Sequence, residues 1–184
     1  SVTGVQTCAL PIYGTYPAYY IAEGAETDKW YLHHQGGGWC ESLEDCLGRS
    51  KTDLGSSKNY PDSQDLGGGY FSSDPNENPM MWNWTKVFLR YCDGGSFSGM
   101  NMTVENFEDT SLYWRGGYVR EAIEKDLFEN QGLGKVTDLV VSGCSAGGLA
   151  TYLHTDQWCD ALHEQNPSGK CVGLPDSGFF LDYQ

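Results

Sequence analysis

VTDLVVSGCSAGGLATYLHTDQW, the stretch from Val136 to Trp158, decides the fold of this chain. Its first six residues, mostly apolar and β-branched, predict a buried strand. The residues from Leu149 onward suit a helix with three side chains facing inward, namely Ala150, Leu153 and Trp158. Gly143 to Gly147 lie between these elements and match G-x-S-x-G, a tight turn that lifts a serine hydroxyl above the edge of a sheet.

Similar patterns occur upstream. Residues Asn83 to Tyr91 predict a second buried strand around Val87-Phe88-Leu89. Beyond Thr110, a suitable cap, apolar residues recur at helical spacing until Gly132 and Gly134 interrupt them, and we predict one amphipathic helix there. Its expected apolar positions are Leu112, Tyr113, Val119, Ala122, Ile123 and Leu127.

Two short runs near the start of the chain are rich in aromatic and β-branched residues. They cover Tyr16 to Ile21 and Lys29 to His34, and the polar turn at Glu23 to Glu26 separates them. We interpret this pair as a β-hairpin. Gly36 to Pro79 is dominated by Gly, Ser, Asp, Asn and Pro, which predicts long loops with one or two short helices.

Strands that alternate with helices predict an α/β fold. We expect an α/β-hydrolase-like, mostly parallel sheet with helices on both faces and right-handed crossovers. A chain of 184 residues with 39% hydrophobic residues supports one core, so residues 13–184 are expected to belong to a single domain. Residues 1–12 look like the translation of a sequencing-adapter oligonucleotide, and the alternative is a genuine N-terminal strand.

The G-x-S-x-G turn makes Ser145 the candidate nucleophile. The same turn directs the backbone N–H of Ala146 toward a reacting carbonyl, which gives one oxyanion donor. Gly36-Gly37-Gly38-Trp39 follows the strand ending at His34, in the order expected of a glycine-rich loop that completes an oxyanion hole. The alternative for this loop is a flexible segment tethered by Cys40.

A serine hydroxyl needs a base, and in this fold the acid and the histidine follow the serine. His154 and His163 lie on or near the predicted helix after Ser145, too early for that role, and His33 and His34 precede the serine. We assign all four to structural or surface roles. We therefore expect the catalytic Asp and His beyond residue 184. Cys144 is not expected to be catalytic, because the turn exposes Ser145 and directs Cys144 inward.

Composition excludes several classes of partner. The net charge of −14 and the pI of about 4.4 argue against nucleic acid and anionic membrane surfaces. No run is long and apolar enough to span a membrane, and no Lys/Arg-led apolar segment opens the chain as a signal peptide would, so we expect the targeting signal to be absent or lost. Seven Cys residues without a C-x-x-C pair argue against structural zinc, and we expect no metal or organic cofactor.

The cysteines favour an oxidising compartment. Cys40 with Cys46, and Cys159 with Cys171, are suited to close two disulfide loops, and reduced thiols in a cytosolic enzyme are the alternative. Two N-x-[ST] sequons, at Asn83 and at Asn101, also favour a secreted glycoprotein. We expect a secreted monomer. The Asp93-to-Gly99 segment is interpreted either as a pocket loop or as a turn-rich connection.

Several ordered blocks resemble the pectin acetylesterase and Notum carboxylesterase family. The resemblance spans about Gly14 to the end of the chain and lies in Pro17 to Tyr20, Gly36 to Cys40, Trp82 to Trp84, Arg90 to Gly99, Gly143 to Gly148 and Asp176 to Phe180. It implies a secreted serine esterase with Ser145 as nucleophile and the amides of Gly38, Trp39 and Ala146 as oxyanion donors. It also implies the Cys40–Cys46 pairing, places the family's Asp and His beyond Phe180, and leaves the bonding of Cys92 open.

The resemblance is stronger toward the pectin acetylesterase branch. It implies that residues 13–184 are the N-terminal part of one serine-esterase domain, truncated before its C-terminal strands, that acts on O-acetyl esters of a cell-wall, pectin-like polysaccharide. One alternative is a Notum-like deacylase of a lipid-modified protein. The other is a catalytically inert, secreted carbohydrate-binding module on a hydrolase scaffold.

Overall fold

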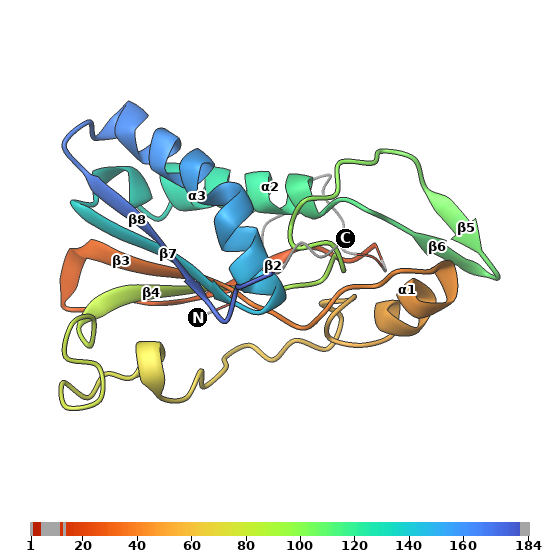
Figure 1. Cartoon of the computed structure of the whole chain (residues 1–184), viewed down its shortest axis with the longest axis horizontal. Coiled ribbons are helices and arrows are strands. Elements are labelled where there is room, and N and C mark those ends of the chain that lie inside the picture. The colour runs from red at the N-terminus through yellow and green to blue at the C-terminus, as the bar shows by residue number, and fades with distance from the viewer. Residues whose placement is uncertain (1, 5–11, 13, 181–184) are drawn as a thin grey trace.

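A six-stranded sheet organises the computed structural model, which describes residues 2–4, 12 and 14–180 (Figure 1). The strand order is β1-β2-β4-β3-β7-β8. β3, β4, β7 and β8 run parallel, and β2 joins β4 antiparallel, so the sheet is mostly parallel as predicted. The strands are β1 Val2–Gly4, β2 Ala18–Ala22, β3 Glu26–His34, β4 Trp84–Leu89, β7 Asp138–Cys144 and β8 Lys170–Asp176.

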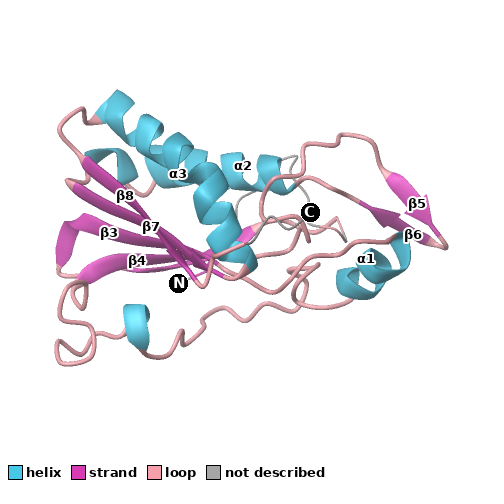
Figure 2. Ribbon diagram, in the orientation of Figure 1, coloured by secondary structure: helices cyan, strands magenta, loops and turns pink. Residues whose placement is uncertain are grey.

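Two long helices cover one face of the sheet, α2 Gly116–Glu129 and α3 Ala146–Gln165 (Figure 2). Alternate strand residues meet them because successive side chains of a strand point to opposite faces. Leu32 lies opposite Val87 in β4 and Val141 in β7, and all three are fully buried in one apolar cluster with the two helices. This cluster is the core of the chain.

The opposite face is covered by the long connection between β3 and β4. It carries α1 Leu43–Ser50 and the 3₁₀ helix η1 Gly69–Phe71, which agrees with the prediction of loops with one or two short helices. Phe71 packs edge-on against Tyr31, His33 and Phe88 at centroid distances of 5.5, 5.2 and 5.6 Å. These contacts fix the connection on the sheet.

The predicted hairpin is wrong. β2 and β3 do not pair with each other, because β4 lies between them, antiparallel to β2 and parallel to β3. The predicted helix after Thr110 also begins too early. Residues Thr110–Leu112 form β6, which pairs with β5 Glu105–Phe107 in a separate ribbon, and α2 starts at Gly116.

The helix after Ser145 is longer than predicted, and the side chains that face the core differ in part from those predicted. Ala150 and Trp158 are fully buried as expected, but Leu153 is 51% exposed and His154 faces inward in its place. After α2, the 3₁₀ helix η2 Leu133–Lys135 leads into β7. In the described parts of the chain, no helix combines the length and apolar character needed to cross a membrane.

The N-terminal stretch is only partly described. β1 pairs with β2, and the backbone N–H of Ile12 donates to the carbonyl of Cys92 at 3.1 Å. Cys8 lies outside the described residues. The adapter origin of residues 1–12 stays a prediction.

Candidate functional site

The site forms where the sheet changes its direction of growth. β3 and β7 are neighbours in the sheet. The connection after β3 leads to β4 on one side, whereas the connection after β7 leads to β8 on the other, so the two connections diverge at the carboxyl ends of these strands. In open α/β sheets, such a switch point leaves a crevice for ligands. The glycine-rich loop from Gly36 to Trp39 follows β3, and the Gly143–Gly147 turn begins in the last two residues of β7.

Ser145 is exposed at the end of β7 and caps α3. Its φ of 57° and ψ of −119° place it in a conformation that non-glycine residues rarely adopt. The buried Ala146 begins the helix, where backbone N–H groups lack intrahelical partners and the helix dipole favours negative charge. The strand-turn-helix context predicted for the nucleophile is therefore present, and Cys144 beside it is a half-buried free thiol.

Glycines are required because two backbones cross closely under this turn. A Cβ at Gly36 would lie 2.1 Å from the carbonyl oxygen of Cys144 and 3.4 Å from the Cβ of Ser145. A Cβ at Gly147 would lie 2.0 Å from the carbonyl oxygen of His34. Any side chain at either position would force the turn and the glycine-rich loop apart. The loop that begins at Gly36 and the Ser145 turn therefore lie side by side.

Gly37 and Gly38 give the loop its path. Their φ values of 139° and 67° lie in the region that favours glycine. Trp39 follows with 38% of its side chain exposed, and its ring contacts that of Phe180 at a centroid distance of 5.8 Å. This ring contact joins the loop to the residues that follow β8.

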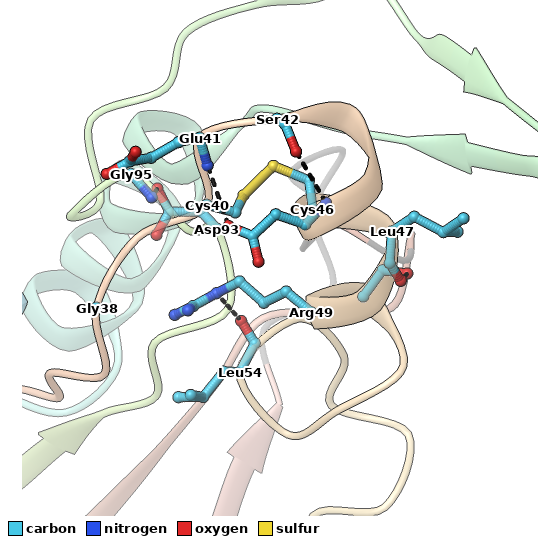
Figure 3. The surroundings of a disulfide bond; sticks show 12 residues. Gly38, Cys40, Glu41, Ser42, Cys46, Leu47, Arg49, Leu54, Asp93 and Gly95 are labelled. Atoms are coloured by element: carbon cyan, nitrogen blue, oxygen red, sulfur yellow. Dashed lines mark hydrogen bonds between the residues drawn. A yellow bond between two sulfur atoms is a disulfide. The ribbon is translucent and has the colours of Figure 1, made fainter.

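A disulfide fixes the far end of the loop to α1. Cys40 and Cys46 are bonded, with Cα atoms 5.1 Å apart, and Arg49 lies beside them, donating from Nε to the carbonyl of Leu54 at 3.0 Å (Figure 3). The second predicted disulfide, Cys159–Cys171, joins α3 to β8. Both pairings are confirmed.

Cys92 and Asp93 lie behind the loop. Cys92 is a buried free thiol among the described residues, and burial raises its pKa. The Asp93 carboxylate accepts hydrogen bonds from the backbone N–H groups of Phe97 and Gly95 at 3.1 and 3.2 Å. Burial raises the pKa of Asp93 to about 6, although these bonds oppose the shift. The segment from Asp93 to Gly99 packs against the glycine-rich loop, where Cys40 N–H donates to the Gly94 carbonyl.

The histidines all have partners away from Ser145. His34 is fully buried, with Nδ1 3.0 Å from the carbonyl of Ser142 and Nε2 accepting from the indole of Trp158. His33 contacts the Tyr31 hydroxyl at 2.9 Å. Burial lowers the pKa of His34 to about 3 and that of His33 to about 4, so both are neutral at physiological pH.

The other two histidines lie on α3. His154 contacts Ser98 and Gln157, and burial lowers its pKa. Nε2 of His163 lies 2.9 Å from the carbonyl of Gly169. These contacts match the structural roles expected from the sequence.

Comparisons with known proteins identify the family. A family model described as Pectinacetylesterase matches residues 3–184. The chain belongs to the pectinacetylesterase family. It is 41% identical over 171 residues to pectin acetylesterase 5 of Arabidopsis thaliana, covering 92% of this chain and 39% of that protein.

The chain is also similar to proteins from animals. The chain is 34% identical to palmitoleoyl-protein carboxylesterase NOTUM of Mus musculus, covering 92% of this chain and 33% of the relative. The solved structure of the Wnt deacylase Notum from Drosophila superposes with a TM-score of 0.89 at 27% identity, over 100% of this chain and 54% of that one. This match confirms the α/β-hydrolase-like fold. The chain spans about two fifths of the length of the pectin acetylesterases it matches.

Proposed function

We propose that this chain carries the nucleophile of a serine carboxylesterase that hydrolyses O-acetyl esters of a cell-wall-type, pectin-like polysaccharide. The supporting observation is the exposed Ser145 on a strained turn, packed against the glycine-rich loop whose amides we propose as oxyanion donors. Membership of the pectinacetylesterase family supports the same activity.

The proposed reaction has two steps. Oγ of Ser145 attacks the ester carbonyl carbon while its proton passes to a general base, and the resulting oxyanion accepts hydrogen bonds from the amides of Gly38, Trp39 and Ala146. The bond to the sugar oxygen then breaks, and that oxygen takes the proton. Water next attacks the acyl-serine, which releases acetate and restores the hydroxyl.

The base and its acid partner are proposed to follow residue 184. The four histidines support this placement, because each one contacts a partner other than Ser145. In the described part of the chain, no side chain hydrogen-bonds the Ser145 hydroxyl. Assays of activity therefore use the full-length protein.

A deacylase of lipid-modified protein is the second candidate, and one feature favours it. Next to the turn, a cavity of about 290 Å³ is lined largely by apolar side chains, and the Wnt deacylase structure superposes closely. Its lining residues are Leu149, Tyr152, Gly178, Phe179 and Phe180. The higher identity to pectin acetylesterases, 41% against 34%, leads us to rank acetyl first.

Acetate release from acetylated glycans by the full-length protein, beside Ser145→Ala, tests the proposal. We expect the wild type to release acetate and the variant to release none above background. Esters of increasing chain length separate the candidates, since the deacylase predicts higher kcat/KM for long acyl chains. An inert binding module predicts that a fluorophosphonate probe leaves Ser145 unlabelled.

Secretion as a monomeric glycoprotein of the cell wall is also proposed. Two disulfides support an oxidising compartment, and the charge of −14 disfavours nucleic acid and anionic membranes as partners.

The two sequons differ in accessibility, which gives a prediction. Asn101 and Thr103 are exposed, whereas Asn83 is half-buried, lies 3.4 Å from Glu26 Oε1, and has its sequon Thr85 buried at 3%. We expect a glycan on Asn101 and none on Asn83. Peptide mass spectrometry of protein secreted from a eukaryotic host checks this, with Asn101→Gln as the control. A glycan found only on Asn83 would contradict it.

A further inference from the structure

Two side chains donate hydrogen bonds to carbonyls of the glycine-rich loop. Nη1 of Arg49 donates to the carbonyl of Gly37 at 2.8 Å. The hydroxyl of Tyr91 donates to the carbonyl of Gly38, also at 2.8 Å. Arg49 comes from α1 and Tyr91 from the residues that follow β4, so two separate elements reach the same short loop.

These bonds fix the direction of the next amides. In a trans peptide, the C=O of one residue and the N–H of the next lie in one plane and point in opposite directions. The described peptide bonds include no cis bond. Holding the Gly37 carbonyl therefore aims the N–H of Gly38 away from Arg49, and holding the Gly38 carbonyl aims the N–H of Trp39 away from Tyr91. These are two of the three amides proposed to bind the oxyanion.

Ser96 connects this loop to the third amide-bearing residue. Its Oγ accepts from the indole N–H of Trp39 and donates to the carbonyl of Ala146, both at 2.8 Å. Its own backbone N–H donates to the Tyr91 hydroxyl at 3.0 Å. The hydroxyls of Tyr91 and Ser96 thus join both halves of the proposed oxyanion hole in one network.

Two members of the network are buried. Tyr91 and Ser96 are 0% and 1% exposed, and the guanidinium of Arg49 lies 4.8 Å from the centre of the Tyr91 ring. Ser96 has a φ of 52°. The Asp93 carboxylate holds the turn around it by accepting hydrogen bonds from the backbone N–H groups of Gly95 and Phe97. The bonds of Tyr91 and Ser96 hold their geometry, because breaking a hydrogen bond between buried groups leaves a polar atom unpaired and away from water.

We propose that Arg49, Tyr91 and Ser96 are positioning residues that aim the oxyanion amides of Gly38 and Trp39 and fix their separation from Ala146. The inference rests on the proposed esterase function and adds three residues that act through the backbone. They stabilise the transition state by preorganising donors, so their loss lowers kcat more than it changes KM.

Tyr91→Phe in the full-length protein tests the inference, because it removes one hydroxyl and keeps the ring. Tyr20→Phe is the matched control, since Tyr20 is also buried, at 4% exposed, and its hydroxyl donates to the carbonyl of Pro61 at 2.9 Å, in a bond that involves none of the proposed oxyanion residues. We expect kcat to fall by about 10-fold or more in Tyr91→Phe, with KM changed by less than about twofold. Tyr20→Phe should retain the wild-type kcat.

A transition-state analogue supplies a second readout that general destabilisation would not move. Ser145 Oγ would add to the carbonyl carbon of a trifluoromethyl ketone, with its proton passing to the base, to give a tetrahedral oxyanion. The Ki of the trifluoromethyl ketone should rise in Tyr91→Phe by the same factor by which kcat/KM falls. Equal kcat and equal Ki in Tyr91→Phe and Tyr20→Phe would overturn the inference. Equal acetate release by wild type and Ser145→Ala would instead remove the proposed function.

Variants of Arg49 test the inference if Tyr91→Phe does not fold. Its side chain is half-buried, and Arg49→Met keeps the aliphatic part while removing the donor to Gly37. We expect Arg49→Met to lower kcat and Arg49→Lys, which keeps a donor, to restore part of it. Wild-type kcat in folded Arg49→Met would refute the positioning role.

Discussion

Ser145 occupies a strained conformation at the centre of the proposed chemistry. Residues in such regions cost about 1–3 kcal/mol and persist only when the surrounding structure holds them. Here the backbone N–H of Ser145 donates to the carbonyl of Asp176 in the edge strand, and its carbonyl accepts from Leu149 in the first turn of α3. The turn leaves the Ser145 side chain exposed to solvent, where a substrate can reach it.

Relief of this strain gives a prediction about stability. Ser145→Gly should raise the free energy of unfolding by about 1 kcal/mol relative to Ser145→Ala, because glycine adopts a positive φ without steric cost. Denaturant unfolding of the two variants checks the difference, and both should lack acetate release. A Ser145→Gly variant less stable than Ser145→Ala would contradict the account of the turn.

The buried histidines give a prediction about pH. Since the pKa of His34 is lowered to about 3 in the fold, the unfolded chain, with an ordinary pKa near 6.5, takes up the proton first. The contribution of His34 to stability is therefore complete above pH 6.5 and is lost as the pH falls toward 3. Nitrogen-15 NMR of the imidazoles should show His34 and His33 neutral at pH 5.5. Titration of His34 near pH 6.5 in folded protein would refute this.

At the scale of elements, a comparison of the two disulfides separates an effect on the free energy of unfolding from an effect on the position of the glycine-rich loop. The Cys40–Cys46 bridge closes a loop of sequence separation 6 and anchors the glycine-rich loop, whereas Cys159–Cys171, of separation 12, joins α3 to β8. Loop-closure entropy predicts that removing either costs about 2–3 kcal/mol. We expect only the Cys40→Ser/Cys46→Ser pair to lower kcat. Steady-state kinetics at a temperature where both double variants are folded checks this, and equal kcat losses would contradict it.

The local sequence patterns predicted the individual helices and strands better than they predicted which strands pair. The strand before Ser145, the turn and the following helix were predicted because a mostly apolar, β-branched run, the G-x-S-x-G glycines and a helical stretch are adjacent in sequence. The hairpin failed because β4, the strand inserted between β2 and β3, arrives some fifty residues later. Leu153 was placed inward in error, because the apolar pattern does not show that His154 is buried with partners on the Asp93–Gly99 segment.

The candidate site was also predicted only in part. The glycine-rich loop and the Ser145 turn carry signals in their own sequences, but Arg49, Tyr91 and Ser96 act through contacts between distant segments. Ser96 lies in the Asp93–Gly99 segment, whose sequence was equally typical of a pocket loop and of a simple connection. Only the folded structure brings its hydroxyl to Trp39 and Ala146.

At the scale of the whole molecule, the net charge of −14 carried by these 184 residues opposes the approach of a polyuronate, the class of substrate proposed above. Added salt screens this repulsion, because the Debye length falls from about 30 Å at 0.01 M to about 10 Å at 0.1 M. We expect KM for acetylated polygalacturonate to fall as salt rises over this range. KM for a neutral acetylated glycan should not change. An equal salt response for both polymers would contradict the electrostatic argument.

Trapping the acyl-enzyme tests the central claim most directly. The full-length protein is mixed with an activated acetyl ester, quenched in acid within milliseconds, digested and examined by mass spectrometry. We predict one acetyl group on the peptide that contains Ser145, absent from Ser145→Ala and lost as the reaction turns over. Acetate release without any acetyl group on Ser145, or an acetyl group that accumulates on Cys144 instead, would contradict the account.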